Sequence, residues 1–230
     1  MTDSPKRVRV AVALLAGALA LAGLCYSSWI LEFVLPIDID PVNTFLSELD
    51  AVGKPYRAVF ATADKIVGVL LVPAAIAGLL LFARLRWSTI GWVALLCFGA
   101  ATIADAMLPL HDCVPTPKTT CGGPRALFPQ LHEPHALSSS LAVCSIAVAG
   151  IAFSVAAFRY RRWALLRTVG TAILVLGTAA TVWMMVADDL SGHYALGIAQ
   201  RIQVGAISLW LIVFGIAVTD RSERVSSARP

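Results

Sequence analysis

Histidines and carboxylates gather beside the same ends of long apolar segments in this 230-residue sequence. "HEPH" (132–135) places two imidazoles three residues apart, and His193 follows a later apolar segment. Neutral imidazoles with carboxylates are ligands that Zn²⁺ prefers, and bound zinc activates water against an ester or amide. His132, His135 and His193 are therefore candidate ligands for a divalent metal such as zinc, without the H-E-x-x-H spacing of a zinc protease.

Pro134 modifies the interpretation of the two neighbouring histidines. Proline favours the first helical turn, so we predict a helix that begins at Pro134 and leaves His132 in the preceding loop. His135 would then lie at the positive end of the helix dipole, which favours a neutral imidazole. Ser138 and Ser139 would share its face, either as site residues or as small residues that let helices approach closely.

Charged residues near the same membrane face extend the candidate site. Asp64 and Asp105 lie inside apolar segments, where a carboxylate costs about 1–3 kcal/mol unless it faces a partner or water. Asp64 either faces the bundle or lies at the surface among lipid headgroups. Arg201 is expected to pair with Asp188, Asp64 or Asp105. The predicted binding residues are Glu48, Asp64, Asp105, His135, Asp188 and Arg201.

The elements that must position these residues are membrane helices. Hydrophobic residues make up 58% of the chain and charged residues 14%, whereas soluble domains have about 45–50% and about 25%. Six apolar runs are long enough to cross about 30 Å of hydrocarbon as helices, and too long for barrel strands. They cover residues 10–31, 59–82, 89–110, 135–158, 164–187 and 198–218.

We therefore predict an all-α fold, a bundle of six transmembrane helices that forms a single domain over residues 10–218. Residues 1–9 would form a cytoplasmic N-terminus, and the polar segment 219–230 a disordered cytoplasmic tail. The first run continues beyond Cys25, which favours an uncleaved span over a signal peptide. The basic residues fall in short clusters beside apolar runs, so nucleic acid is not an expected partner.

The distribution of basic residues predicts the orientation of the bundle. Twelve of the 18 Lys and Arg residues lie on the side of the two chain ends. The positive-inside rule places that side in the cytoplasm, so we expect a multi-pass cell-membrane protein with both termini inside. Trp87, Trp92 and Trp163 lie beside the basic turns and are expected to form an interfacial belt.

Two cysteines occur in the second outer loop. Cys113 and Cys121 flank "VPTPKTT", and a disulfide between them would stabilise the loop by about 2–3 kcal/mol. A zinc site built from the same cysteines and nearby histidines is the alternative.

The segment "FLSELDAVGKPYR" (45–57) carries several charges between two apolar runs. We expect a short helix that begins near Phe45 and is capped by Asn43 or Thr44, with Gly53 and Pro55 ending it. It is predicted to form an amphipathic lid on the outer face. Glu48 and Asp50 would then lie at the membrane surface, above Asp64.

The same segment carries a family resemblance. "NTFLSELDAVGKP" (43–55), "LH" (131–132), and "QR" (200–201) followed by Leu209 and Trp210 resemble the integral membrane domain-of-unknown-function family numbered 998. The resemblance implies a multi-helix prokaryotic membrane protein without a settled activity.

Three functions remain open from the residues alone. The first is a membrane protein that binds a lipid headgroup, a protein partner or a second copy of itself at its outer polar cluster. The second is a metal-dependent hydrolase that acts on a lipid at the outer face. The third is a small-solute transporter, which is disfavoured because the inner halves of the spans are nearly free of ionisable residues.

Overall fold

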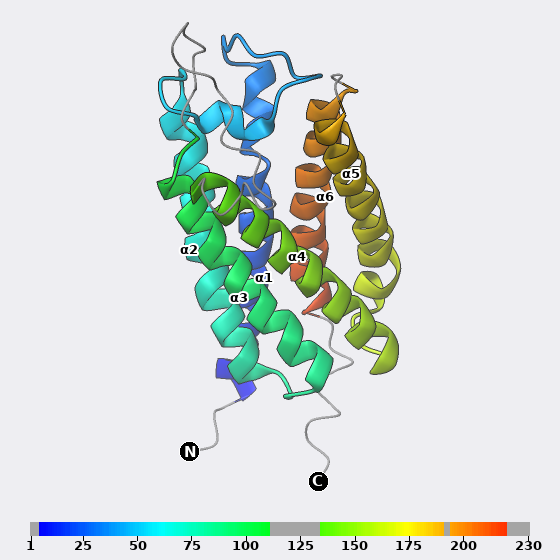
Figure 1. The fold of residues 1–230 in the computed structure, drawn as a ribbon. Coiled ribbons are helices and arrows are strands. Elements are labelled where there is room, and N and C mark those ends of the chain that lie inside the picture. The colour runs from blue at the N-terminus through cyan, green and yellow to red at the C-terminus, as the bar shows by residue number, and fades with distance from the viewer. Residues whose placement is uncertain (1–4, 111–133, 191–193, 220–230) are drawn as a thin grey trace, which may run out of the picture.

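The computed structural model describes residues 5–110, 134–190 and 194–219. Within these ranges, six helices are long and apolar enough to cross a membrane, which confirms the predicted fold class (Figure 1). The long helices are α1 (Pro5–Tyr26), α2 (Arg57–Leu81), α3 (Arg86–Met107), α4 (Pro134–Arg159), α5 (Thr171–Asp189) and α6 (Leu196–Ala217). Shorter helical turns are η1 (Ser28–Phe33), η2 (Leu46–Asp50) and the π-helical turn η4 (Leu166–Gly170).

The helices pack side by side along one axis. α1 lies between α2 and α6, and α3 lies between α2 and α4. α5 packs mainly along α6, so it is the most peripheral helix of the bundle. α4 and α5 meet at the end where the chain joins them and diverge toward the other end (Figure 1). The second and third long helices, α2 and α3, therefore pack closely against each other, whereas the fourth and fifth, α4 and α5, have little contact.

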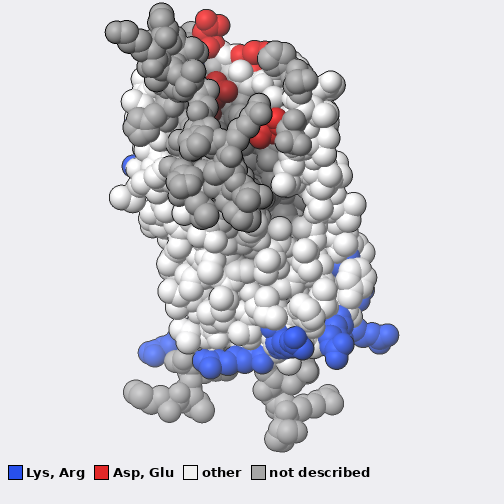
Figure 2. Space-filling model, viewed as in Figure 1, with Lys and Arg blue, Asp and Glu red and all other residues white. Residues whose placement is uncertain are grey.

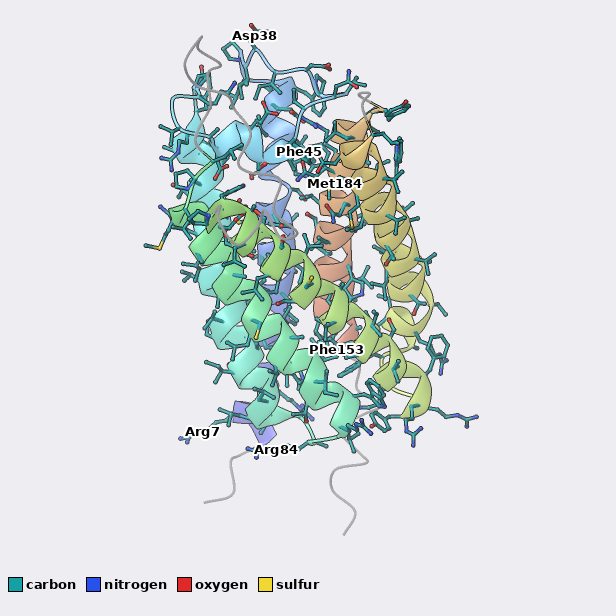
Figure 3. The ribbon with its side chains drawn as sticks, viewed as in Figure 1. Arg7, Asp38, Phe45, Arg84, Phe153 and Met184 are labelled. Atoms are coloured by element: carbon teal, nitrogen blue, oxygen red, sulfur yellow. The ribbon has the colours of Figure 1, made fainter. Side chains whose placement is uncertain are left out.

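Charge divides the two ends of the bundle. Figure 2 shows Lys and Arg in a band at one end and Asp and Glu at the other. We call these the basic end and the acidic end; Arg7 and Arg84 mark the first and Asp38 the second (Figure 3). α1 begins and α6 ends at the basic end (Figure 1). The prediction that the basic end lies in the cytoplasm is based on this asymmetry of charge.

Aromatic side chains fill the bundle toward the basic end. The rings of Trp92 and Phe153 have centroids 4.9 Å apart, and those of Phe153 and Phe214 are 4.3 Å apart. Trp163 packs edge-on against both phenylalanines. Phe153 is labelled in Figure 3, inside the bundle. Trp210 extends the same cluster.

The predicted interfacial belt is wrong for two of its three tryptophans. Trp92 and Trp163 are each 1% exposed and belong to the aromatic core. Side chains from α3, α4 and α6 meet in this region. The rings of Trp92 and Trp163 turn inward because they bury more apolar surface there than at the membrane interface. Trp87 is half-buried, with the Arg86 guanidinium 5.5 Å from its ring centroid.

Small residues set the distance between neighbouring helices. A Cβ added to Gly68 of α2 would lie 2.5 Å from the carbonyl oxygen of Gly99 on α3. Only a residue without a side chain therefore lets α2 and α3 approach this closely, the usual means of packing helices in a membrane. This close contact holds Asp64 and Asp105 within the same end of the bundle.

Candidate functional site

Asp105 is the centre of a polar network between α3 and α4. The hydroxyls of Ser138 and Ser139 both donate to its Oδ1, at 2.6 and 2.7 Å. Nδ1 of His135 lies 3.4 Å from the same oxygen. Pro134 is helical and is the first residue of α4 that the structure describes. The helix places His135 and the two serines on the face that meets α3.

His135 is 8% exposed and has a defined tautomer. Its Nδ1 lies 2.9 Å from the carbonyl oxygen of Leu108, which can only accept a hydrogen bond. Nδ1 therefore carries a proton. In the neutral ring Nε2 is then an acceptor, and it lies 3.4 Å from the oxygen of Ser139, whose hydroxyl proton is donated to Asp105. The imidazole thus links the end of α3 to the first turn of α4.

Three carboxylates line one pocket of about 110 Å³ at the acidic end. They are Asp50 from η2, Asp64 from α2 and Asp105 from α3. Ser139 and the amides of Gln200 and Gln203 add neutral polar groups. The described residues that line this acidic pocket include no Lys, Arg or His. Because like charges oppose one another's ionisation, the pocket attracts protons or a cation.

The aromatic side chains Tyr26, Trp29 and Phe60 complete the wall of the acidic pocket. A ring face attracts a cation through its quadrupole, and the attraction increases when water is excluded. Carboxylates and aromatic side chains in one wall therefore both suit a cationic ligand. A single water needs only about 10–15 Å³ of such space, so the pocket is large enough for a small organic group.

Asp50 is buried, contrary to the prediction that it lies at the membrane surface. It is 7% exposed, because η2 is a 3₁₀ helix with three residues per turn. This spacing turns Leu46, Ser47, Leu49 and Asp50 toward the acidic pocket. Burial raises the pKa of the Asp50 carboxyl above its ordinary value; a protonated His135 opposes the rise, and the charge of Asp105 adds to it.

The predicted cap of this helical turn is also wrong. The turn begins at Leu46, close to the predicted start, but Phe45 occupies the cap position without a side-chain cap. Instead the Glu48 carboxylate accepts a hydrogen bond of 3.3 Å from the Phe45 backbone N–H. Asn43 and Thr44 donate to Asp40, at 2.8 and 2.5 Å. Their side chains therefore stabilise the preceding turn.

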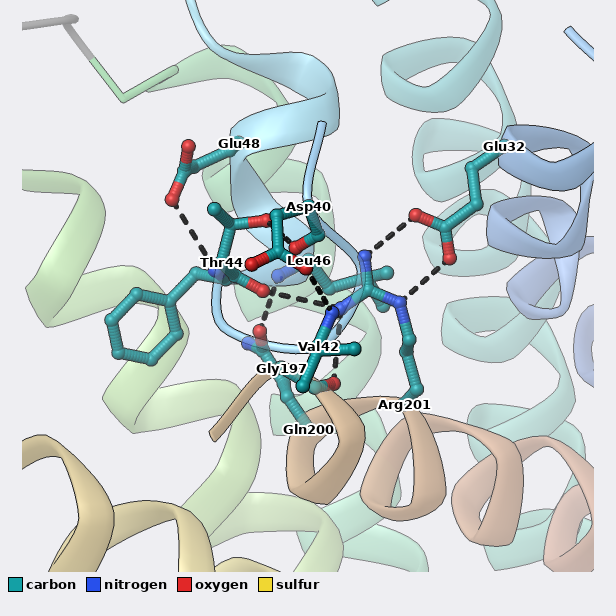
Figure 4. A network of polar contacts seen from close by, with 10 residues as sticks. Glu32, Asp40, Val42, Thr44, Leu46, Glu48, Gly197, Gln200 and Arg201 are labelled. Carbon is teal, nitrogen blue, oxygen red and sulfur yellow. Dashed lines mark hydrogen bonds and ion pairs between the residues drawn. The ribbon is translucent and has the colours of Figure 1, made fainter. Parts of the chain in front are cut away.

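Arg201 forms a buried ion pair with Glu32, and not with any of the three predicted aspartates (Figure 4). Its Nε donates to Oε1 at 2.7 Å and its Nη2 to Oε2 at 2.6 Å, a bidentate geometry. The two side chains are 7% and 5% exposed. η1 follows α1 directly and carries Glu32 to the start of α6, whereas Asp64 and Asp105 face the neighbouring acidic pocket.

The same arginine holds the segment 40–46 against α6. Its Nη1 donates to the carbonyl oxygen of Thr44 at 3.1 Å, and the Gln200 side-chain oxygen accepts from the Leu46 N–H (Figure 4). The Gly197 N–H donates to the carbonyl oxygen of Val42 at 3.0 Å. A Cβ at Gly197 would lie 2.5 Å from the Thr44 carbonyl oxygen, so the close approach requires glycine. This clamp fixes the segment that leads into η2.

The structure brings together only part of the predicted binding set. Asp64, Asp105 and His135 belong to one polar region. Glu48 lies on the opposite side of η2 from the pocket-lining residues, and Arg201 belongs to the clamp. Asp188 is exposed near the end of α5 and does not line the acidic pocket. His132, His193, Cys113 and Cys121 lie outside the described residues.

The predicted zinc centre therefore has one ligand in the described part of the chain. Within residues 5–110, 134–190 and 194–219, no group of three or more His, Cys, Asp and Glu side chains is arranged to hold a metal ion. Nδ1 of His135 is bonded to Leu108, which leaves Nε2 as its one free ligand atom. A metal at this ring would need His132 or His193 to complete its coordination.

Sequence reasoning missed the contributions of Asp50, Gln203 and the aromatic residues to the site. Tyr26 and Trp29 look like ordinary membrane-interface residues, because nothing in the apolar run shows which side of the helix faces the bundle. The signal that could have placed Asp50 in the pocket was the three-residue spacing of positions 46 and 49 and of positions 47 and 50, which is the spacing of a 3₁₀ helix. It competes with an α-helical period of 3.6, in which Asp50 falls on the polar face.

Fold and site together define a multi-pass helical membrane protein with an acidic, aromatic-walled pocket at one end of the bundle. The chain belongs to the family described as "Protein of unknown function (DUF998)", whose model matches residues 19–217. This confirms the resemblance seen in the sequence. No curated protein and no solved structure matches the chain.

Proposed function

We propose that the acidic pocket binds the amine headgroup of a membrane amphiphile at the outer face of the membrane. One observation carries the proposal: carboxylates from η2, α2 and α3 converge on a pocket whose described lining has no cationic side chain. Arg201, the buried cation nearest in sequence to Gln200 and Gln203, is paired with Glu32. The described lining of the pocket thus presents carboxylates to a ligand without a Lys or Arg side chain among them.

The buried carboxylate of Asp50 supports a ligand site in particular. It is more than nine-tenths buried and lines the pocket, and among the described residues the hydrogen bond that it accepts comes from the backbone and not from a side chain. A buried polar group of this kind costs free energy unless a partner arrives. An ammonium group provides a positive charge and N–H donors that can pair with the carboxylates of Asp50 and Asp64.

The aromatic wall favours an organic ammonium group as the cation. Tyr26, Trp29 and Phe60 line the pocket beside the acids, and cation–π contacts are typical of alkylammonium recognition. The depth of Asp64 favours a lipid as the molecule that carries the ammonium group. Asp64 lies about two turns inside the membrane-spanning helix α2. A ligand that reaches it must occupy the membrane.

A simple amine tests this proposal without any lipid chain. Butylamine is titrated into the protein purified in a non-ionic maltoside detergent, with butanol as the uncharged comparison, and binding is followed by calorimetry. We expect saturable binding of butylamine alone, weakened at least tenfold by Asp50→Asn combined with Asp64→Asn. Asp38→Asn is the matched control, because it removes an exposed carboxylate at the same end of the bundle. Equal binding by all three proteins would refute the proposal.

A metal-dependent lipid hydrolase is the second candidate. It is favoured by the Ser139 hydroxyl, which lies 3.4 Å from Nε2 of His135 and 2.7 Å from Asp105. His132 and His193 would have to complete a zinc site with His135, and a bound zinc would supply an activated water. Metal analysis of the purified protein and of His135→Ala tests it: stoichiometric zinc that is lost in the variant is the expected result.

The aromatic core does not support the transporter hypothesis, because the described residues of this core form no polar path toward the basic end.

A further inference from the structure

A second cavity of about 120 Å³ lies between α4, α5 and α6, where α5 diverges from α4. We call it the apolar groove. Its walls are hydrocarbon, with Ile146, Leu174 and Trp210 among the lining residues. The polar side chains at its edge satisfy one another, since Gln203 donates to the Thr181 hydroxyl at 2.8 Å and Thr181 donates to the Gly177 carbonyl oxygen at 2.8 Å. The groove therefore suits an apolar ligand.

The apolar groove continues directly from the acidic pocket. Val143, Gln203 and Ile207 line both. Along α6 the lining runs from Gln200 in the pocket, through Gln203, to Trp210 in the groove. Trp210 lies seven positions after Gln203, which corresponds to about 10 Å of helix, about a third of the thickness of the hydrocarbon layer. Pocket and groove thus form one path along the bundle axis, charged at one end and apolar at the other.

Close contacts between helices bound the groove on two sides. On one side, a Cβ at Gly150 of α4 would lie 2.7 Å from Leu174 of α5, so these helices touch toward the basic end. On the other, a Cβ at Gly177 of α5 would lie 3.1 Å from Ala206 of α6. The groove is closed where both pairs of helices meet.

We propose that the apolar groove holds the hydrocarbon chain of the same molecule whose ammonium group lies in the acidic pocket. The ligand class is a single-chain amine amphiphile. This inference rests on the proposed function for the head of the ligand and adds the site of its tail. Charge complementarity and the shared walls of the two cavities select this occupant over an uncharged lipid chain, which would leave the carboxylates unpaired.

Chain length is the variable that tests the groove separately from the pocket. The protein in maltoside detergent is titrated with butylamine, decylamine and decanol, and the affinities are corrected for partitioning into empty micelles. Each methylene that enters the groove is expected to increase affinity about fourfold. Ala147→Phe places a ring in the groove, and we expect it to weaken decylamine binding at least tenfold while butylamine binding stays unchanged.

Matched variants separate this effect from general damage. Ala179→Phe adds the same ring on the exposed face of α5, outside the groove, and should leave both affinities unchanged. Thr178→Leu narrows the groove at an exposed lining position, and serves where Ala147→Phe does not fold. It is expected to weaken decylamine binding selectively.

The possible failures are distinguishable. If butylamine does not bind, the proposed function fails and the tail site fails with it. If butylamine binds but decylamine gains no affinity, or retains its gain in both groove variants, the tail site alone is overturned. Decanol binding as tight as decylamine binding, and insensitive to Asp50→Asn, would also overturn it, because the groove would then hold any apolar chain.

Discussion

The coupling free energy between the buried side chains of Arg201 and Glu32 should be large enough to measure. Arg201→Met leaves the Glu32 carboxylate, which is 5% exposed, without its bidentate partner. Removing one member of a buried pair costs about 3–5 kcal/mol. The variant also removes the donor to the Thr44 carbonyl oxygen, which adds about 1–3 kcal/mol if that oxygen stays buried.

The double variant should be more stable than the sum of the single changes implies. Glu32→Gln combined with Arg201→Met leaves no unpaired charge, so its cost consists mainly of the lost contacts to segment 40–46. We therefore expect a coupling free energy of about 2–3 kcal/mol between the two positions. The measurement is a double-mutant cycle in mixed micelles, with unfolding by sodium dodecyl sulfate followed through tryptophan fluorescence.

Lys65→Met is the control for loss of one positive charge at the acidic end. Lys65 is exposed, so its removal should change the free energy of unfolding by less than about 0.5 kcal/mol. Additive effects of Glu32→Gln and Arg201→Met, within about 0.5 kcal/mol, would refute the reasoning. The ion pair would then contribute no more than a solvent-exposed one.

Four further predictions follow from the site and the core. Gly197→Ala should displace segment 40–46 and increase its cleavage by chymotrypsin, because the added Cβ meets the Thr44 carbonyl oxygen at 2.5 Å; unchanged cleavage would contradict the clamp. Butylamine affinity should fall as the pH is lowered through the pKa of Asp50. The fall should begin at a higher pH than for an ordinary aspartate, because burial raises that pKa and only the ionised form pairs with the ammonium group; Asp64 and Asp105 line the same pocket, and His135 and Arg57 act on the Asp50 charge from outside its lining, so all four contribute to the profile. Trp92→Ala should cost about 3–5 kcal/mol of stability through a core cavity, with Trp87→Ala as the milder comparison. In intact cells, an impermeant maleimide should label Asp38→Cys but label Arg84→Cys only after lysis, each in a cysteine-free background; the reverse pattern would invert the predicted orientation.

The number of spans and the separation of charge were predictable from the amino-acid sequence. A segment in hydrocarbon must satisfy its own backbone hydrogen bonds, so an apolar run of about 20 residues has to be a helix wherever it lies in the bundle. A helical Pro134 in the first described turn of α4 agrees with a similarly local rule, since proline lacks the N–H that an interior helical position needs. Asp64 and Asp105 were recognised as site residues because carboxylates at that depth need a partner or water.

Which residues face one another was decided by the tertiary structure alone. Arg201 pairs with Glu32, 169 residues away, and Asp50 turns inward on a 3₁₀ helix. Trp92 and Trp163 fill the core, although hydropathy allows them at the interface equally well. The physical reason is the same in each case. Hydropathy determines that a helix crosses the membrane, but its rotation and depth relative to its neighbours depend on close packing at positions such as Gly68 and Gly197, and that packing selects the partner of each buried charge.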